Sequence, residues 1–170
     1  KLKMEIYKIS SFHVTDLNLI EAIASKKKPV IMSTGMSTLE EIDAAVKILN
    51  KHSCEYLIMH CVSSYPADPK DLNLRAINVL RSRHSCLVGY SGHETSANIA
   101  PSVVLFNACA IERHFTLDRA MKGPDHALSL SPSGMDILVK RSKMLFDARG
   151  REEKFVTDSE LKARKKFRGY

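Results

Sequence analysis

The chain has 170 residues, of which 44% are hydrophobic and 26% are charged. These proportions are typical of one globular domain of ordinary size and exclude a disordered protein. No apolar run approaches the roughly 18 to 20 residues of a membrane helix, and the sequence starts without a signal-peptide pattern, so we expect neither a membrane span nor a membrane partner.

The net charge of +7 is concentrated at the C-terminal end of the sequence. Residues 161–170 contain five basic side chains and no acidic one, and without them 21 basic and 19 acidic residues remain, a net charge of +2. A short basic run is more typical of a solvated linker than of a binding patch, so we expect no nucleic-acid partner. A basic tail that binds a polyanion is the alternative.

The four cysteines form no Cys-x-x-Cys pair; they are Cys54, Cys61, Cys86 and Cys109. Three of them lie at the ends of predicted strands, where a free thiol behaves as a small hydrophobe. We therefore expect reduced cysteines and a cytoplasmic protein.

Strand and helix signals alternate along the chain. Short apolar runs predict five strands, over residues 5–10, 29–33, 56–61, 86–90 and 109–114. Between and after them, helical periodicity and start signals predict five helices, over residues 16–24, 39–49, 73–82, 96–107 and 131–148.

Several residues mark where these helices start. Asp16 is the expected cap of the first helix, and Ser131 followed by Pro132 is the expected start of the last. Pro101 either starts the regular part of the fourth helix or kinks it. Two overlapping capping boxes precede the second helix, Ser37 with Glu40 and Thr38 with Glu41.

Short strands that are apolar on both faces, each followed by a helix, predict a parallel α/β sheet covered by helices. No G-x-G-x-x-G follows any predicted strand, so the dinucleotide-binding fingerprint of a doubly wound sheet is absent from the sequence. A (β/α)₈ TIM barrel needs eight strands and about 250 residues. Five strands therefore form either an open sheet or a part of something larger.

Small polar residues follow the predicted strands: Ser10-Ser11, Ser33-Thr34, Ser63-Ser64, Ser91 and Thr116. Ligands bind at the carboxyl ends of parallel strands, an end of the sheet that we call the mouth. Serines that converge there suit a phosphate-bearing ligand. A single serine after a strand is otherwise an ordinary turn residue. Lys8 lies within a strand, so it either points inward toward an anionic ligand or extends outward from an edge.

His93 and His114 end two successive predicted strands. Two imidazoles leave coordination positions for water and substrate oxygens, which suits a catalytic Mn²⁺, Mg²⁺ or Zn²⁺ ion. A lone strand-end histidine is otherwise more often structural. Asp125 follows a Gly-Pro turn near the same mouth, and Tyr65 precedes Pro66, which favours an extended backbone there. The alternative for Asp125 is an ordinary surface turn, and the alternative for Tyr65 is a packing role.

Six segments together resemble one known family: YKISS (7–11), VIMSTGM (30–36), HCVSSYP (60–66), GYSGHET (89–95), ERHFTLD (112–118) and KGPDH (122–126). They resemble the sialic acid synthase family, which includes N-acetylneuraminate synthase and spore-coat polysaccharide synthases. The resemblance covers nearly all of residues 5–148. Residues 97–107 depart from the family's usual small-residue helix.

The resemblance implies a partial TIM barrel, about strands 4–8, over residues 1–150, and a linker over residues 151–170 into an antifreeze-like (SAF) domain. It implies a cytoplasmic homodimer that condenses phosphoenolpyruvate with an N-acylated hexosamine and releases phosphate. The family's catalytic glutamate and a phosphate-binding lysine would lie upstream of this chain, and an arginine would come from the antifreeze-like domain across the dimer. We therefore expect the chain alone to be inactive.

The resemblance also assigns roles to residues of this sequence. His93 and His114 would hold Mn²⁺ or Mg²⁺, and Tyr65 and Asp125 would orient the sugar. Phosphoenolpyruvate would contact the remaining candidates, Lys8, Ser11, Ser33, Ser91 and, near its carboxylate end, Ser63. The alternatives are another phosphoenolpyruvate or aldol-type barrel enzyme and a non-catalytic binding module with a polyanion-binding tail.

Overall fold

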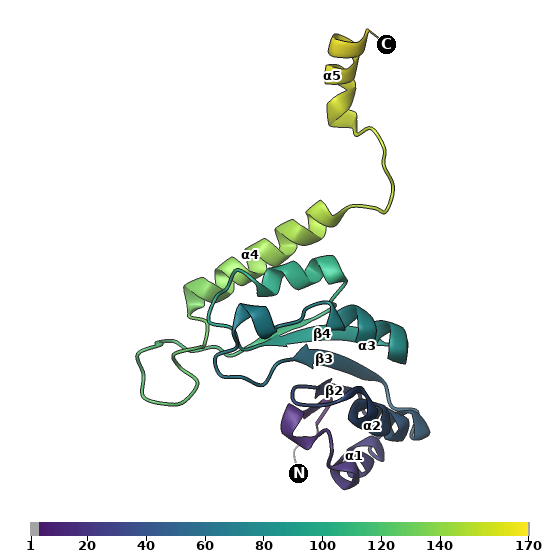
Figure 1. Ribbon diagram of the computed structural model, residues 1–170, viewed down its shortest axis with the longest axis vertical. Coiled ribbons are helices and arrows are strands. Elements are labelled where there is room, and N and C mark those ends of the chain that lie inside the picture. The colour runs from purple at the N-terminus through teal and green to yellow at the C-terminus, as the bar shows by residue number, and fades with distance from the viewer. Residues whose placement is uncertain (1–3, 170) are drawn as a thin grey trace.

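The structure is a computed structural model that describes residues 4–169 (Figure 1). Over this range five strands form one parallel sheet, in which each strand pairs with the next one along the chain. Strand order that follows the sequence without reversal distinguishes a barrel segment from a doubly wound sheet. The strands are β1 (Tyr7–Ile9), β2 (Val30–Ser33), β3 (Tyr56–Cys61), β4 (Leu87–Gly92) and β5 (Ile111–Arg113).

Helices follow the strands, as the alternating pattern predicts. They are α1 (Leu17–Ala24), α2 (Leu39–Lys51), α3 (Ala76–His84), the 3₁₀ helix η3 (Ala100–Phe106), α4 (Pro132–Arg149) and α5 (Asp158–Arg168), with short 3₁₀ turns η1 (Ser11–His13) and η2 (Pro69–Asp71). The predicted fold class, a part of a TIM barrel, is confirmed. The third predicted helix was placed too early, because Asn73 has a positive φ of 41° that interrupts a helix.

Most of the predicted helix starts are confirmed. Asp16 Oδ1 accepts a hydrogen bond of 3.0 Å from the Leu19 N–H and caps α1. Of the two capping boxes before α2, Thr38 with Glu41 forms. The box between Ser37 and Glu40 is wrong, because the Ser37 hydroxyl donates instead to the Gly35 carbonyl at 3.4 Å.

The predicted α-helix over residues 96–107 is also wrong in type and extent. A 3₁₀ helix, η3, spans Ala100–Phe106 and has Pro101 in its first turn. Proline is tolerated there because its missing N–H would have no intrahelical partner, so Pro101 starts the helix and does not kink it. The helix ends at Asn107, whose left-handed backbone (φ 58°) terminates it.

Side-chain alternation divides the sheet into two faces. Ile9, Met32, Ile58 and Val88 face the helices and form the hydrophobic core together with residues of α1, α2 and α3. Residues of the opposite parity face the concave side, where β1 to β5 would enclose the barrel lumen. This alternation decides which strand residues reach the candidate site.

The C-terminal basic run forms a largely exposed helix, and its role as a linker stays a prediction. After α4 an extended stretch leads to α5, which stands away from the sheet and its helices (Figure 1). The five basic residues lie on or beside this helix, which begins with a capping box between Thr157 and Glu160. Between residues 4 and 169, no helix is both long and apolar enough to cross a membrane. The four cysteines are free thiols.

Candidate functional site

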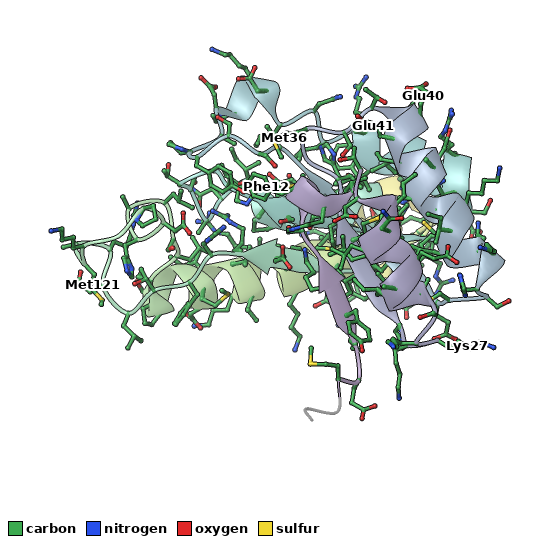
Figure 2. All side chains as sticks on the ribbon, turned by 90° about the horizontal axis from the view of Figure 1, so that it is seen from below. Phe12, Lys27, Met36, Glu40, Glu41 and Met121 are labelled. Atoms are coloured by element: carbon green, nitrogen blue, oxygen red, sulfur yellow. The ribbon has the colours of Figure 1, made fainter. Side chains whose placement is uncertain are left out.

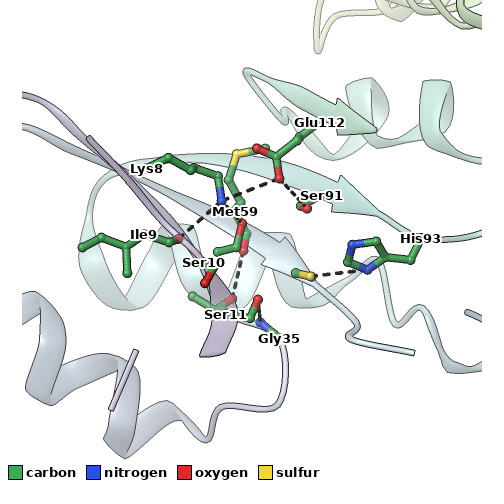
Figure 3. Close-up of polar contacts among 12 residues, drawn as sticks. Lys8, Ile9, Ser10, Ser11, Gly35, Met59, Ser91, His93 and Glu112 are labelled. Carbon is green, nitrogen blue, oxygen red and sulfur yellow. Dashed lines mark hydrogen bonds and ion pairs between the residues drawn. The ribbon is translucent and has the colours of Figure 1, made fainter. Parts of the chain in front are cut away.

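Lys8 extends from β1 across the concave face of the sheet (Figure 3). Its ammonium group donates to the Ser33 hydroxyl at 2.7 Å and to the Ile9 carbonyl at 3.3 Å. The inward orientation of Lys8, one of two alternatives at the sequence level, is therefore the one that the fold adopts. It places a cation beside a serine hydroxyl at the carboxyl ends of β1 and β2.

Glu112 of β5 completes this cluster. Its Oε1 lies 3.6 Å from the Lys8 ammonium and accepts a hydrogen bond of 2.8 Å from the Ser91 hydroxyl. A cavity of about 250 Å³ opens here, and Ser91, Glu112 and His114 are among its lining residues. We call Lys8, Ser33, Ser91 and Glu112 the Lys8 cluster. Three of its four members were predicted as ligand contacts.

Ser11 and Ser63 meet at Gly35, in the loop after β2. The Gly35 N–H donates to the Ser11 hydroxyl at 2.9 Å. A Cβ at Gly35 would lie 2.1 Å from Ser63 Oγ and 3.0 Å from Ser11 Oγ, so only glycine lets both hydroxyls approach the loop. Cys61 borders the same point, with its Sγ 3.9 Å from Ser63 Oγ. Both predicted serines therefore reach the mouth beside the Lys8 cluster.

His93 and His114 lie side by side, with ring centroids 5.2 Å apart. The Tyr65 ring packs on His93 at 4.2 Å and meets His114 edge-on at 6.1 Å. Asp125 Oδ2 is 3.6 Å from His114 Nδ1. Tyr65, His93 and His114 follow three different strands, and Asp125 lies in the long loop after β5. Met121, in the same loop, points away from the rest of the molecule (Figure 2). The peptide bond between Tyr65 and Pro66 is cis.

The histidine pair fits a shared divalent ion. His93 Nδ1 lies 2.8 Å from the Val62 carbonyl, and a hydrogen bond donated there leaves the Nε2 lone pair free for a ligand. Within residues 4–169, no group of three or more His, Cys, Asp or Glu side chains is placed to hold a metal ion. An ion at this point would thus have two protein ligands from this part of the chain and open positions for substrate oxygens, as a catalytic site requires.

The electrostatics of the mouth centre on Cys61 and His93, whose Sγ and Nδ1 atoms are 3.8 Å apart. Burial opposes ionisation of the Cys61 thiol, but contacts with His93 and Ser11 lower its pKa. Burial likewise opposes protonation of His93, yet contacts with Cys61 and the Val62 carbonyl raise its pKa. Burial also raises the pKa of the Tyr65 hydroxyl. The mouth therefore favours a neutral Tyr65 beside a polarised thiol–imidazole pair.

Sequence reasoning missed Glu112 and Cys61 as members of the mouth. Glu112 and Glu94 both lie next to or near the predicted histidines in the sequence, which does not tell the two carboxylates apart. In the structure Glu112 faces the mouth, whereas Glu94 is buried behind it. Parity along the strand would have found Glu112, because a residue two positions before His114 shares its face.

The chain is similar to known proteins of one family. A family model described as the NeuB family matches residues 1–154. N,N'-diacetyllegionaminic acid synthase of Campylobacter jejuni is 37% identical over 95% of this chain and 49% of its own length. N-acetylneuraminate-9-phosphate synthase of Drosophila melanogaster is 42% identical over 81% of this chain and 37% of its own length.

A solved structure supports the same assignment. The crystal structure of the sialic acid synthetase of Leptospira borgpetersenii with citrate has a TM-score of 0.87 and 34% identity, over 97% of this chain and 59% of that one. The chain spans about half the length or less of the curated relatives named above. These matches confirm the resemblance to sialic acid synthases, and the chain belongs to the NeuB family.

Proposed function

We propose that the protein containing this chain condenses phosphoenolpyruvate with an N-acylated amino sugar resembling N-acetylmannosamine. A carbon–carbon bond forms between the phosphoenolpyruvate methylene and the sugar aldehyde carbon, one water molecule is consumed, and phosphate leaves. The product is a nonulosonic, sialic-type acid. The observation that carries the proposal is the meeting of the Lys8 cluster with the His93–His114 pair in one mouth.

The Lys8 cluster is suited to an anionic ligand. An ammonium group and two serine hydroxyls, from Ser33 and Ser91, supply the donors that phosphate and carboxylate oxygens accept. Ser11 and Ser63, at the Gly35 loop, extend this row of hydroxyls along the mouth. We assign these residues to phosphoenolpyruvate, with Ser63 toward its carboxylate.

The other side of the mouth is suited to the sugar. His93 and His114 would hold a divalent ion, Mn²⁺ or Mg²⁺, which when bound supplies a Lewis acid for the aldehyde oxygen. Tyr65 offers a neutral hydroxyl and a ring that packs on His93 and meets His114 edge-on. Asp125 offers a carboxylate that can accept from sugar hydroxyls and lies beside His114. Tyr65 and Asp125 thus orient the sugar toward the bound phosphoenolpyruvate.

The general acid or base of the reaction is not among the residues that we assign here. By resemblance, it is a glutamate on an upstream strand, and a second phosphate ligand, a lysine, accompanies it. An arginine from an antifreeze-like domain, reached through residues 151–170, would complete the site across a homodimer. We therefore propose that residues 1–150 supply the later part of the barrel and that the 170-residue chain is inactive alone.

Phosphate release tests this proposal. With Mn²⁺, phosphoenolpyruvate and N-acetylmannosamine or a related amino sugar, the full-length protein should release phosphate and form the nine-carbon acid. His93→Ala and His114→Ala should each lower metal-stimulated turnover by more than about 100-fold, the upper range for loss of an outer-shell partner. Turnover by the 170-residue chain alone would contradict its inactivity, and unchanged turnover in both variants would contradict the metal assignment.

The choice of acceptor separates this function from its enzymatic alternative. If the full-length protein uses phosphoenolpyruvate with aldose phosphates and rejects N-acylated amino sugars, it is another phosphoenolpyruvate or aldol-type barrel enzyme. Product formation measured over a panel of both sugar classes decides between the two, since both reactions release phosphate.

A further inference from the structure

A buried ion pair lies directly behind the two histidines. The side chains of Glu94 and Arg113 are each 1% exposed, and Arg113 Nη1 donates to Glu94 Oε1 at 2.8 Å. The second carboxylate oxygen, Oε2, accepts from the Tyr90 hydroxyl at 2.9 Å. Arg113 also donates to the backbone carbonyls of Glu94 and Ser96. The pair thus fixes both the side chain and the backbone that follow His93.

Its place along the strands is informative. Glu94 directly follows His93, and Arg113 directly precedes His114. The last paired residues of the β4–β5 ladder are Gly92 and Arg113. Beyond this point no ladder hydrogen bond between the two strands sets the spacing of the histidine backbones, and the Glu94–Arg113 pair takes over as the cross-strand link.

The pair is a poor device for stability alone. Both charges leave water, and the buried Arg113 Nε–H has no hydrogen-bond partner among the described residues. Burying an ion pair incompletely compensated in this way costs more than packing two apolar side chains of similar size. The pair also requires a glycine at position 92, because a Cβ there would lie 2.6 Å from Glu94 Oε2 and 3.1 Å from Arg113 Cδ.

We propose that Glu94 and Arg113 are positioning residues that hold the His93 and His114 imidazoles at the separation needed to share one divalent ion. The inference rests on the metal site of the proposed function. It assigns to the buried pair a role in metal affinity that is separable from its role in folding. Neither residue contacts the ion or a substrate in this proposal.

The test compares metal affinity with stability in the full-length protein. Mn²⁺ affinity is measured by calorimetry and by electron paramagnetic resonance without substrates, and unfolding is measured by thermal melts. Arg113→Ala should weaken Mn²⁺ binding by about 10- to 100-fold, the range seen when an outer-shell partner is lost. Leu49→Ala, a fully buried change in α2, should lower the melting temperature and leave Mn²⁺ affinity within about twofold.

A double variant separates the two roles. Glu94→Leu with Arg113→Met removes both charges and fills the space, so the melting temperature should return toward that of the wild type. Mn²⁺ affinity should stay below that of the wild type, because the ion pair that links the two strands is still missing. The d–d spectrum of Co²⁺ bound to this variant should likewise differ from the wild-type spectrum. Recovery of Mn²⁺ affinity together with stability would show that the pair is only structural.

Other outcomes are equally decisive. Unchanged Mn²⁺ affinity in Arg113→Ala would overturn the inference while leaving the proposed function intact. If His93→Ala and His114→Ala also bind Mn²⁺ as the wild type does, the metal site itself is wrong and the positioning role falls with it. The histidine variants therefore distinguish failure of the proposed function from failure of this inference.

Discussion

The Lys8 ammonium and the Glu112 carboxylate, from the first and last strands of the sheet, lie 3.6 Å apart. In a flat sheet, four spacings of about 4.8 Å would hold β1 and β5 about 19 Å apart, beyond the reach of these two side chains. Their contact therefore requires the sheet to curl so that its two edge strands face each other across a lumen. This curvature is the geometric mark of a barrel, and it brings the predicted ligand contacts from five strands together at one end of the sheet.

The Lys8–Glu112 contact gives a prediction about anion binding. Lys8→Met should raise the KM for phosphoenolpyruvate by about tenfold or more, because the ammonium group that would pair with the anionic ligand is lost. Glu112→Gln keeps the hydrogen bond from Ser91 but removes a negative charge near the ligand, which at this partial exposure is worth about 1 kcal/mol. Phosphoenolpyruvate should then bind about fivefold more tightly. Equal or weaker binding by Glu112→Gln would mean that Glu112 supports the ligand directly.

Gly35→Ala should damage the mouth more than the fold. The new Cβ would force Ser63 Oγ, 2.1 Å away, to rotate out of place, while the backbone φ of Gly35 stays acceptable to alanine. We expect a stability change below about 1 kcal/mol and a clear rise in the KM for phosphoenolpyruvate. Gly134→Ala in α4 is the matched control, since its Cβ would meet neighbours at 3.5 Å or more. Equal kinetics of the two variants would exclude a role for the Ser63 hydroxyl.

Tyr65 combines two roles that substitutions can separate. Tyr65→Phe retains the ring packed on His93 and removes only the hydroxyl, so Mn²⁺ affinity should be preserved while the KM for the sugar rises. Tyr65→Ala removes the ring, which lies 4.2 Å from His93 and 6.1 Å from His114, and should weaken Mn²⁺ binding as well. Calorimetry and initial rates measure the two effects. A sugar KM unchanged in Tyr65→Phe would remove the hydroxyl from sugar recognition.

The sequence indicated which residues lie at the mouth better than it indicated which residues those side chains contact. Strand ends are readable because apolar runs stop there, and parallel topology then places Ser33, Ser91, His93 and His114 at one edge. Glu112 could be placed only by its spacing of two residues from His114, because β5 has three residues, too few for apolar–polar alternation by itself to indicate which face each one occupies. The role of Glu94 was hidden for a different reason: its partner Arg113 is adjacent only after β4 and β5 pair.

Helix-start signals and helical periodicity failed at two places in the chain. Ser37 and Thr38 were equally good caps by spacing, and the hydrogen bond from Ser37 to the Gly35 carbonyl selected Thr38. The helical pattern over residues 96–107 did not show that a 3₁₀ helix would form, with Pro101 in its first turn and α4 packed against it. Such choices depend on neighbours that periodicity does not reveal.

The buried histidine His60 predicts a pH dependence of stability. Burial lowers its pKa, against a smaller opposing effect of the Leu72 carbonyl, which lies 2.8 Å from Nε2. Between this lowered pKa and the usual value of about 6.5, the unfolded chain binds more protons than the folded chain, so the free energy of unfolding rises with pH. The contribution of His60 is complete above about pH 6.5 and is lost as the pH falls below it.

Replacing His60 with glutamine isolates this effect. The amide of His60→Gln can still donate to the Leu72 carbonyl, but it does not titrate. Urea unfolding between about pH 5 and pH 7, above the range in which most carboxylates titrate, should therefore show a shallower loss of stability on acidification than in the wild type. His84 is a useful comparison, because burial lowers its pKa too and His84→Gln should reduce the slope in the same direction. Parallel pH profiles for wild type and His60→Gln would mean that His60 keeps an ordinary pKa in the folded protein.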